Sequence, residues 1–337
     1  MELDQHPETT HRAPFDGLLP EVVLHAVESL GFVCDGRLLA LNSYENRVWQ
    51  VGIEDDAPLI AKFYRPNRWS DEAILEEHAF SLELAAHELP IVAPMVIHDQ
   101  TLHQHLDHRF ALFKRFGGHA PEMADKNTLQ VLGRLMGRIH AIGSTHTFQH
   151  RATLEPKAMG WDSVEALLAS DWIPMHLTAA FESTAHDLLA AVDDIWGMIH
   201  SASLIRLHGD CHPGNILWRD GQAHFVDLDD CRMGPAVQDL WMWLSGSEED
   251  KSQQATWLIE AYRGFCDFDA RQLQLIEALR TLRMIHYQAW LARRWHDPAF
   301  PQAFGWFAEP RHWETVVEQL REQLDLIQQP AIQLQTD

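Results

Sequence analysis

The feature that most limits the possible folds is a change in sequence pattern near residue 117. Before it, short segments rich in Val, Ile and aromatic residues alternate with turn residues, as strands do. We expect strands over 36–44, 46–53, 58–64, 94–106 and 109–116. After Gly117 and Gly118, apolar residues recur mostly at helical spacing. The pattern predicts an α+β chain with a small sheet-containing part followed by a large helical part.

Helix signals refine this division. In the first part we expect helices over 20–31 and over 70–89, where Ser70 can cap the first turn. In the second part we expect helices over 127–143, 163–172, 179–200, 235–244 and 271–295. These elements suggest one lobe over residues 1–116 and a helical lobe over residues 117–337. A ligand cleft is expected where two such units meet.

The composition narrows the kinds of partner. The 337 residues are 46% hydrophobic, which supports a sizeable core, and the net charge is −23. That charge disfavours binding to nucleic acid and to an anionic membrane surface. The first residues do not resemble a secretory signal, no run of about 18 apolar residues occurs, and the four cysteines are scattered. We therefore expect a cytoplasmic protein, monomeric and with reduced thiols.

The most unusual stretch is "RLHGDCHPGNILWRDGQAHFVDLDD", residues 206–230, which crowds carboxylates around two strand-like segments. His208, Asp210 and Asn215 form the pattern HGDxxxxN, and Asp227 follows the segment "HFV". Crowded carboxylates repel unless cations compensate them. Phosphoryl transfer needs such a set: one carboxylate orients the attacking hydroxyl, and oxygen ligands hold magnesium. The stretch predicts a site for a metal ion and a phosphorylated nucleotide.

Earlier in the chain, a lysine, a glutamate and a serine fit the same chemistry. Lys62 lies in the strand-like segment "PLIAKFY", an unusual place for a lysine unless it points into a cleft. The following helix offers Glu76 and Glu77, of which one can face the sheet because neighbouring helical residues point about 100° apart. Ser43 lies between two strands, where a loop could cover phosphate groups. That loop lacks the glycines of a GxGxxG motif, so it is weak support alone.

The motifs "HGDCHPGN" and "FVDLDD" resemble those of the aminoglycoside-phosphotransferase-like kinases. Further segments resemble the RdoA-type bacterial stress-response branch of that superfamily, namely "LNSYENRVWQV", "AKFYRPNRW", "ILEEHAFSLEL", "GPAVQDLWM" and "RRWHDPAFP". The resemblance covers about residues 15–325. It implies a bilobal, protein-kinase-like fold, with a nucleotide-binding lobe first. It also implies ATP and magnesium as cofactors and transfer of phosphate to Ser or Thr hydroxyls of partner proteins.

The resemblance also implies roles for individual residues. Asp210 matches the catalytic aspartate, and Asn215 and Asp227 match the magnesium ligands, Asp227 being the second aspartate of the catalytic centre. Lys62 matches the phosphate-contacting lysine, Ser43 falls in the phosphate loop, and Glu77 fits the ion-pair position better than Glu76. Asp239 matches a buried aspartate that braces the catalytic loop. The sequence Asp227-Leu228-Asp229 replaces the DFG of protein kinases, so a flipping phenylalanine is not implied.

Two alternatives remain open from the residues alone. The chain could phosphorylate a small amine or alcohol, because the chemistry is the same and the acceptor pocket lies in helices that the sequence does not assemble. It could also be a catalytically inactive nucleotide-sensing module, although Lys62, Asp210, Asn215 and Asp227 are all present. The stretch 290–307 mixes arginines with aromatic residues. We expect it to pack internally, with a substrate-docking surface near Arg293 and Arg294 as the alternative.

Overall fold

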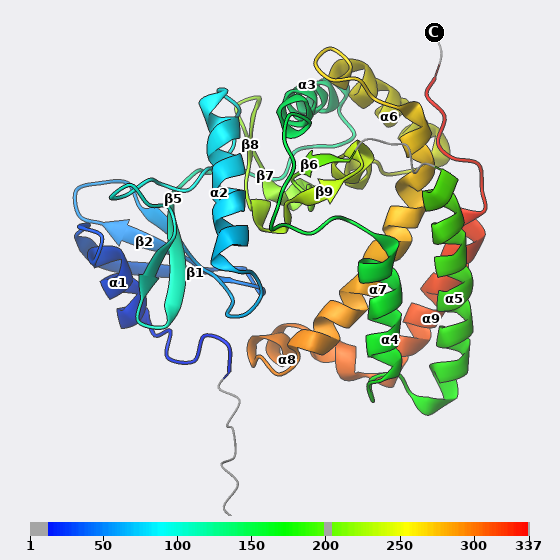
Figure 1. Ribbon diagram of the computed structural model, residues 1–337, viewed down its shortest axis with the longest axis horizontal. Helices are drawn as coiled ribbons and strands as arrows, with labels where there is room; N and C mark the ends of the chain where they lie inside the picture. Colours follow the sequence, from blue (N-terminus) through cyan, green and yellow to red (C-terminus); the bar gives the residue numbers. More distant parts are fainter. Residues whose placement is uncertain (1–12, 199–203, 336–337) are drawn as a thin grey trace, which may run out of the picture.

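The structure is a computed structural model that describes residues 13–198 and 204–335 (Figure 1). Its first part contains a five-stranded antiparallel sheet with the strand order β1-β2-β3-β5-β4. The strands are β1 (Cys34–Leu41), β2 (Arg47–Ile53), β3 (Leu59–Phe63), β4 (His103–His105) and β5 (His108–Lys114). Two helices accompany them, α1 (Pro20–Glu28) and α2 (Asp71–Ala86). The sheet confirms the expected α+β class.

The two faces of the sheet have different roles. Val23 and Val27 of α1 form one buried cluster with apolar residues of the sheet, among them Ala61 and Phe63 of β3. Successive side chains of a strand point to opposite faces. Lys62, between those two residues, therefore points away from α1 and toward the face beside α2. The central position of β3, paired with both β2 and β5, holds Lys62 firmly in place.

The second part is mostly helical (Figure 1). Its helices are α3 (Lys126–Gly143), α4 (Asp162–Leu168), α5 (Met175–Met198), α6 (Glu248–Tyr262), α7 (Leu275–Arg294), α8 (Ala299–Ala303) and α9 (Pro310–Ile327). A short π-helix, Lys157–Trp161, precedes α4. One large core cluster extends through these helices and includes Phe80 and Leu84 of α2. Within the described residues, no helix is long and apolar enough to cross a membrane.

Two local expectations differ from the structure, and some helices were not expected. The helix expected over 235–244 consists of two short 3-10 segments, Ala236–Asp239 and Trp241–Trp243, because their side chains are anchored individually to the neighbouring loop. Of the strand expected over 94–106, the structure has only β4 and isolated bridges. Helices α6 and α9 were not expected, although each buries an apolar face.

The acidic stretch forms two small sheets next to the first part. The hairpin of β7 (Ile216–Arg219) and β8 (Gln222–Phe225) was expected, and β6 (Ile205–Leu207) pairs with β9 (Arg232–Gly234). Backbone hydrogen bonds join the hairpin to the segment after α2: Val92 donates to Phe225 at 2.9 Å, and Phe225 donates to Pro90 at 2.8 Å. The hairpin is thus fixed against the sheet-containing part. A boundary between residues 116 and 117 stays a prediction.

Candidate active site

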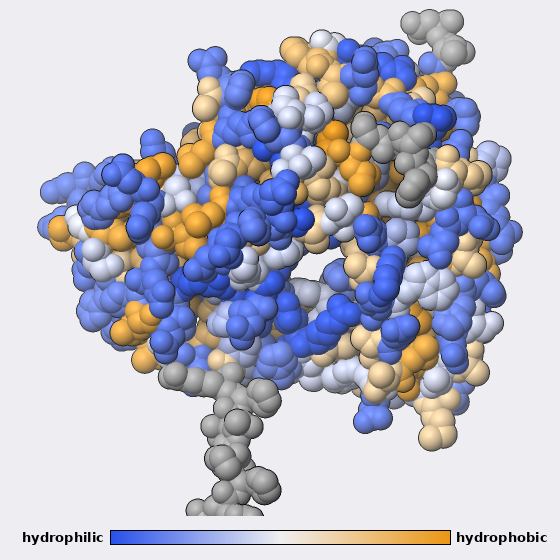
Figure 2. All heavy atoms as spheres, in the orientation of Figure 1, coloured by the Kyte–Doolittle hydropathy of each residue, from blue (hydrophilic) through white to orange (hydrophobic). Residues whose placement is uncertain are grey.

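A cavity of about 870 Å³ lies between the sheet-containing part and the helical part. Figure 2 shows the hollow between them, bordered mainly by hydrophilic residues. All the residues proposed for the site from sequence line this cleft: Ser43, Lys62, Glu77, Asp210, Asn215 and Asp227. Tertiary structure thus brings together residues from β3, α2, the β1–β2 loop and the acidic stretch.

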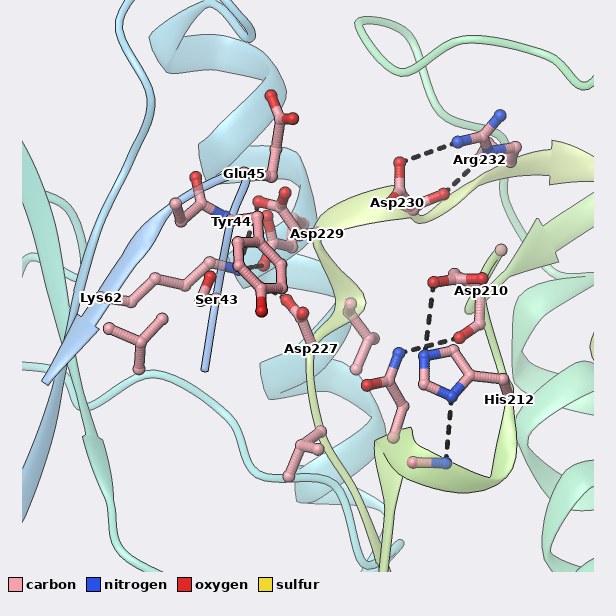
Figure 3. Close-up of a pocket in the computed structure, with 18 of the residues that line it drawn as sticks. Ser43, Tyr44, Glu45, Lys62, Asp210, His212, Asp227, Asp229, Asp230 and Arg232 are labelled. Carbon is pink, nitrogen blue, oxygen red and sulfur yellow. Dashed lines mark hydrogen bonds and ion pairs between the residues drawn. The ribbon is translucent and has the colours of Figure 1, made fainter. Parts of the chain in front are cut away.

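Lys62 is the cation at the base of the cleft. Its Nζ lies 3.0 Å from Asp227 Oδ1, 3.1 Å from Asp229 Oδ1 and 3.6 Å from Glu77 Oε1. Figure 3 shows the side chain extending from the sheet toward the two aspartates. Burial by itself lowers the pKa of Lys62, but the three carboxylates outweigh it and raise that pKa well above its usual value. Lys62 therefore stays protonated across the physiological pH range.

Glu76 and Glu77 have separate partners. Glu77 is buried, and its Oε2 accepts from the Arg151 guanidinium at 2.7 Å, closer than its contact with Lys62. Arg151 also donates to the carbonyl of Asp229 at 2.6 Å. Glu76 instead accepts backbone N–H groups from the loop at 149–151. Of the two glutamates, Glu77 is the one that faces Lys62.

The two aspartates after Asp227 are paired with arginines. Asp229, 3% exposed, forms an ion pair with the Arg68 guanidinium, which also holds Asp230 Oδ1 at 2.8 Å. Arg232 contacts the same oxygen of Asp230 at 2.9 Å. Burial raises the pKa of Asp229, but Arg68 and Lys62 outweigh it and lower that pKa. These two carboxylates are therefore ionised and compensated by protein cations.

Asp210 faces the cleft from the opposite side to Lys62 (Figure 3). Its Oδ1 accepts from Arg283 of α7 at 2.5 Å, and its Oδ2 lies 3.7 Å from His212 Nε2. The Asn215 side-chain amide donates to the Asp210 carbonyl at 2.9 Å. With its NH₂ group used in this way, Asn215 keeps its amide oxygen as the group that can bind a cation, and the residue lines the cleft. The loop therefore offers a carboxylate and an amide oxygen side by side.

A buried network holds this loop in place. Asp239, 0% exposed, accepts from the backbone N–H of His208 at 2.7 Å and of Gly209 at 2.8 Å. His140 contacts the same carboxylate at 3.1 Å. Burial raises the pKa of Asp239, but the hydrogen bonds from His140 and the loop outweigh it and lower that pKa. His208 reaches the Val226 carbonyl at 2.9 Å, which connects the Asp210 loop to the residue before Asp227.

Asp227 has features that suit a metal ligand. Its backbone adopts a left-handed conformation (φ 60°, ψ 64°), which is uncommon for a residue other than glycine. This turn directs the side chain into the cleft, where it is 52% exposed and has Lys62 as its ion-pair partner. Together with the Asn215 amide oxygen, it supplies the hard oxygen donors that a divalent cation prefers. Asp227 and Asn215 thus fit a metal ion, and Lys62 fits phosphate groups beside it.

The loop between β1 and β2, which carries Ser43, is attached to the helical part. Glu45 contacts Arg294 at the end of α7 at 2.8 Å, and Asp297 contacts Arg47 at 2.9 Å and Arg65 at 2.7 Å. Arg65 and Arg68 also lie within 3.5 Å of Glu45. We call this group the clasp, with the carboxylates Glu45 and Asp297 and the arginines Arg47, Arg65, Arg68 and Arg294. It holds Ser43 over the cleft.

The stretch 290–307 packs internally, as expected. Trp290, Phe300 and Phe304 form a cluster of aromatic rings with Tyr44 of the β1–β2 loop. Arg294 is paired with Glu45, so the docking surface considered near Arg293 and Arg294 loses one of its two cations.

Sequence reasoning did not identify three arginines of the site, Arg68, Arg151 and Arg283. Arginine positions carry no motif here, and only the fold brings them next to the carboxylates.

The fold can be compared with solved structures. The chain superposes on amicoumacin kinase hAmiN, solved in complex with AMP-PNP, Ca²⁺ and Ami, with a TM-score of 0.71 and 17% sequence identity, covering 93% of this chain and 94% of that chain. At that identity the likeness shows the fold alone. The fold is thus kinase-like, with a small antiparallel sheet and a large helical part.

Sequence comparison identifies the family. Residues 37–276 match the model of the phosphotransferase enzyme family, and the chain belongs to that family. It is 42% identical over 327 residues to stress response kinase A of Escherichia coli (strain K12), covering 95% of this chain and 97% of the relative. It is 41% identical over 320 residues to the serine/threonine protein kinase RdoA of Salmonella typhimurium, with the same two coverages. The predicted family is confirmed.

Proposed function

We propose that this protein is a magnesium-dependent kinase that transfers the γ-phosphate of ATP to Ser or Thr hydroxyls of proteins in a bacterial stress response. The observation that carries the proposal is the meeting of Lys62, Asp210, Asn215 and Asp227 in one cleft. They come from elements far apart in the sequence, and each has the chemistry that one part of phosphoryl transfer needs. The acceptor class comes from the name of one relative, the serine/threonine protein kinase RdoA, and the stress response from the name of the other.

Each residue would act through what it can contact. The Asp210 carboxylate orients the acceptor hydroxyl and accepts its proton. Lys62 binds phosphate oxygens from the floor of the cleft, and Glu77 with Arg151 keeps the neighbouring helix α2 in register with it. Asn215 and Asp227 would hold magnesium, which neutralises phosphate charge when bound. Ser43 would place its hydroxyl and loop backbone over the phosphates, at the position where the clasp holds it.

The test is to identify the phosphorylated product. The full chain is incubated with labelled ATP, magnesium and a generic protein substrate, beside a panel of amines and alcohols, and the products are analysed by mass spectrometry. We expect label on protein serine or threonine, and none with Asp210→Asn. Label only on a small alcohol or amine would overturn the protein-kinase proposal.

That second outcome defines the competing candidate. The structurally similar amicoumacin kinase is named for a small molecule, so the fold also serves such acceptors. The four site residues named above would then keep the same roles, because they act on the nucleotide and on a hydroxyl of any origin. The acceptor side of the cleft decides between the two candidates.

A further inference from the structure

The acceptor side of the cleft is one face of α7. Its residues Leu279, Leu282, Arg283, His286, Tyr287 and Trp290 line the cavity, at the three- and four-residue spacing of a single helix face. The acidic residue of this helix, Glu277, pairs with Arg280 and does not line the cavity. Burial, reinforced by the positive charge of Arg232, lowers the pKa of His286 to about 4, so that ring is neutral. The face is therefore aromatic and apolar with one cation.

Arg283 differs from the other arginines of the cleft. Arg68 and Arg232 have 15% and 16% of their side chains exposed, and both are held by the carboxylate of Asp230. The Arg283 side chain is 46% exposed, and among residues 13–198 and 204–335 its one carboxylate partner is Asp210. That contact uses NH1. A guanidinium carries five N–H groups in a planar fork, so a side chain with this exposure can bind a second anion.

The partner of Arg283 is also the group that an acceptor hydroxyl must reach. A hydroxyl that donates to Asp210 competes with Arg283 for the same carboxylate, which Arg283 holds at Oδ1. A neutral acceptor would leave the arginine with a weaker partner, and a cationic acceptor would be repelled by it. An acceptor with its own carboxylate close to the hydroxyl offers Arg283 a replacement partner of equal charge.

We propose that Arg283 is an acceptor-binding residue that selects Ser or Thr hydroxyls flanked by acidic residues in a polypeptide, and that the incoming carboxylate draws Arg283 away from Asp210. This inference rests on the proposed function, with Asp210 as the group that receives the hydroxyl proton. The charge of the cleft agrees with it. Six acidic and five basic side chains line the cavity, so the cleft is almost neutral although the whole chain carries −23. The cleft therefore lacks the excess of carboxylates that a polycationic acceptor would need.

The aromatic residues next to Arg283 suit a peptide backbone. The Tyr287 and Trp290 rings stack with centroids 5.6 Å apart at 27°. Trp290 is held in place by its hydrogen bond to Glu45 Oε2 at 2.6 Å. This pair forms a fixed apolar wall one to two turns after Arg283, against which the side chains of an extended segment can pack. The acceptor site would thus combine one specific charge with a nonspecific apolar surface.

The test compares three serine peptides that are identical except for the residues flanking the serine, which are Asp, Asn or Lys. The wild-type chain, Arg283→Gln, Arg283→Lys and Arg280→Gln are assayed for kcat/KM on each peptide. We expect the wild type to prefer the Asp peptide over the Asn peptide by roughly tenfold or more, the contribution of one charge-assisted hydrogen bond. Arg283→Gln should remove this preference, and Arg283→Lys should retain part of it.

Arg280→Gln is the matched control. Arg280 lies one turn before Arg283 on α7 and also pairs with a carboxylate, but it does not line the cavity. It should keep the wild-type preference. A wild type without preference, a preference for the Lys peptide, or a preference that survives Arg283→Gln would overturn the role of Arg283 while leaving the kinase function intact. Phosphate on none of the peptides, in a chain that still binds MgATP, would overturn the protein acceptor and this inference with it.

Discussion

Two pairs of carboxylates lie where the sheet-containing part meets the helical part, and their partners differ. In the clasp, Asp297 is 1% exposed and contacts two arginines, while Glu45 is 14% exposed and lies within reach of three. In the cleft, Asp227 is 52% and Asp210 is 26% exposed, and each contacts one basic side chain at 3.0 Å or less. The clasp is saturated with positive charge, whereas the cleft pair is only partly compensated.

This difference in charge compensation distinguishes the clasp carboxylates, which stabilise the fold, from the cleft carboxylates, which are available for chemistry. A buried carboxylate is tolerated when cations and hydrogen bonds replace its hydration, and removing one member leaves the others uncompensated. A carboxylate with a single exchangeable partner can bind a metal ion or a hydroxyl without disrupting the fold. We therefore expect substitutions in the cleft pair to impair chemistry, and substitutions in the clasp to reduce the free energy of unfolding.

The largest effect is expected at Asp210. Asp210→Asn should leave the melting temperature almost unchanged but lower turnover about 100- to 10,000-fold, because the acceptor hydroxyl loses its oriented base. Thermal unfolding and phosphate transfer are measured on the same preparation. Near-normal turnover in a folded variant would contradict the role given to Asp210 and weaken the comparison with the clasp.

The second-largest effect is expected on stability, from a substitution in the clasp. Asp297→Ala should reduce the free energy of unfolding by about 3 kcal/mol, since it removes the carboxylate that pairs with Arg47 and deprives buried Arg65 of one partner. Chemical denaturation followed by circular dichroism gives the value. The control is Arg219→Ala, which breaks a pair whose side chains are 71% and 87% exposed and should have little effect. Equal losses in the two variants would show that the clasp is not a special point of attachment.

A smaller effect distinguishes the two cleft aspartates from each other. Asp227→Ala should abolish the magnesium-dependent part of the stabilisation by ATP, about 2–3 kcal/mol at a ligand concentration 100 times Kd. Asp210→Asn should retain most of it, because Asp210 is not assigned to the metal. Melting temperatures are compared with ATP in the presence and absence of magnesium. The same loss in both variants would mean that the two roles are assigned incorrectly.

The smallest effect concerns pH. Burial raises the pKa of Asp297, but its hydrogen bonds and Arg47 outweigh it and lower that pKa. A carboxyl group whose pKa is lowered by folding stabilises the protein above its unfolded pKa of about 4 and loses that contribution as pH falls through the folded value. The stability difference between the wild type and Asp297→Asn should therefore narrow below about pH 4. A difference that stays constant from pH 6 to pH 3 would contradict this.

The acidic stretch shows how much can be inferred from local pattern. The sequence indicated that Asp210, Asn215 and Asp227 meet at one site, because all three lie on one continuous segment whose strands pair locally. The segment "PLIAKFY" likewise singled out Lys62, because a lysine within a strand is unusual unless it points into a cleft. In both cases the local pattern identified the residues, whereas the contact between Lys62 and Asp227, 165 positions apart in the sequence, comes from the tertiary structure.

The arginines show where such inference ends. Arg68, Arg151 and Arg283 come from a loop, a second loop and α7, and each meets a carboxylate at least 73 positions away in the sequence. Their pairing depends on how the two parts of the molecule pack, which no local pattern records. The sequence by itself determined which groups can perform phosphoryl transfer. Only the tertiary structure decided which carboxylates are neutralised and which remain accessible, because compensation of charge depends on distance in space.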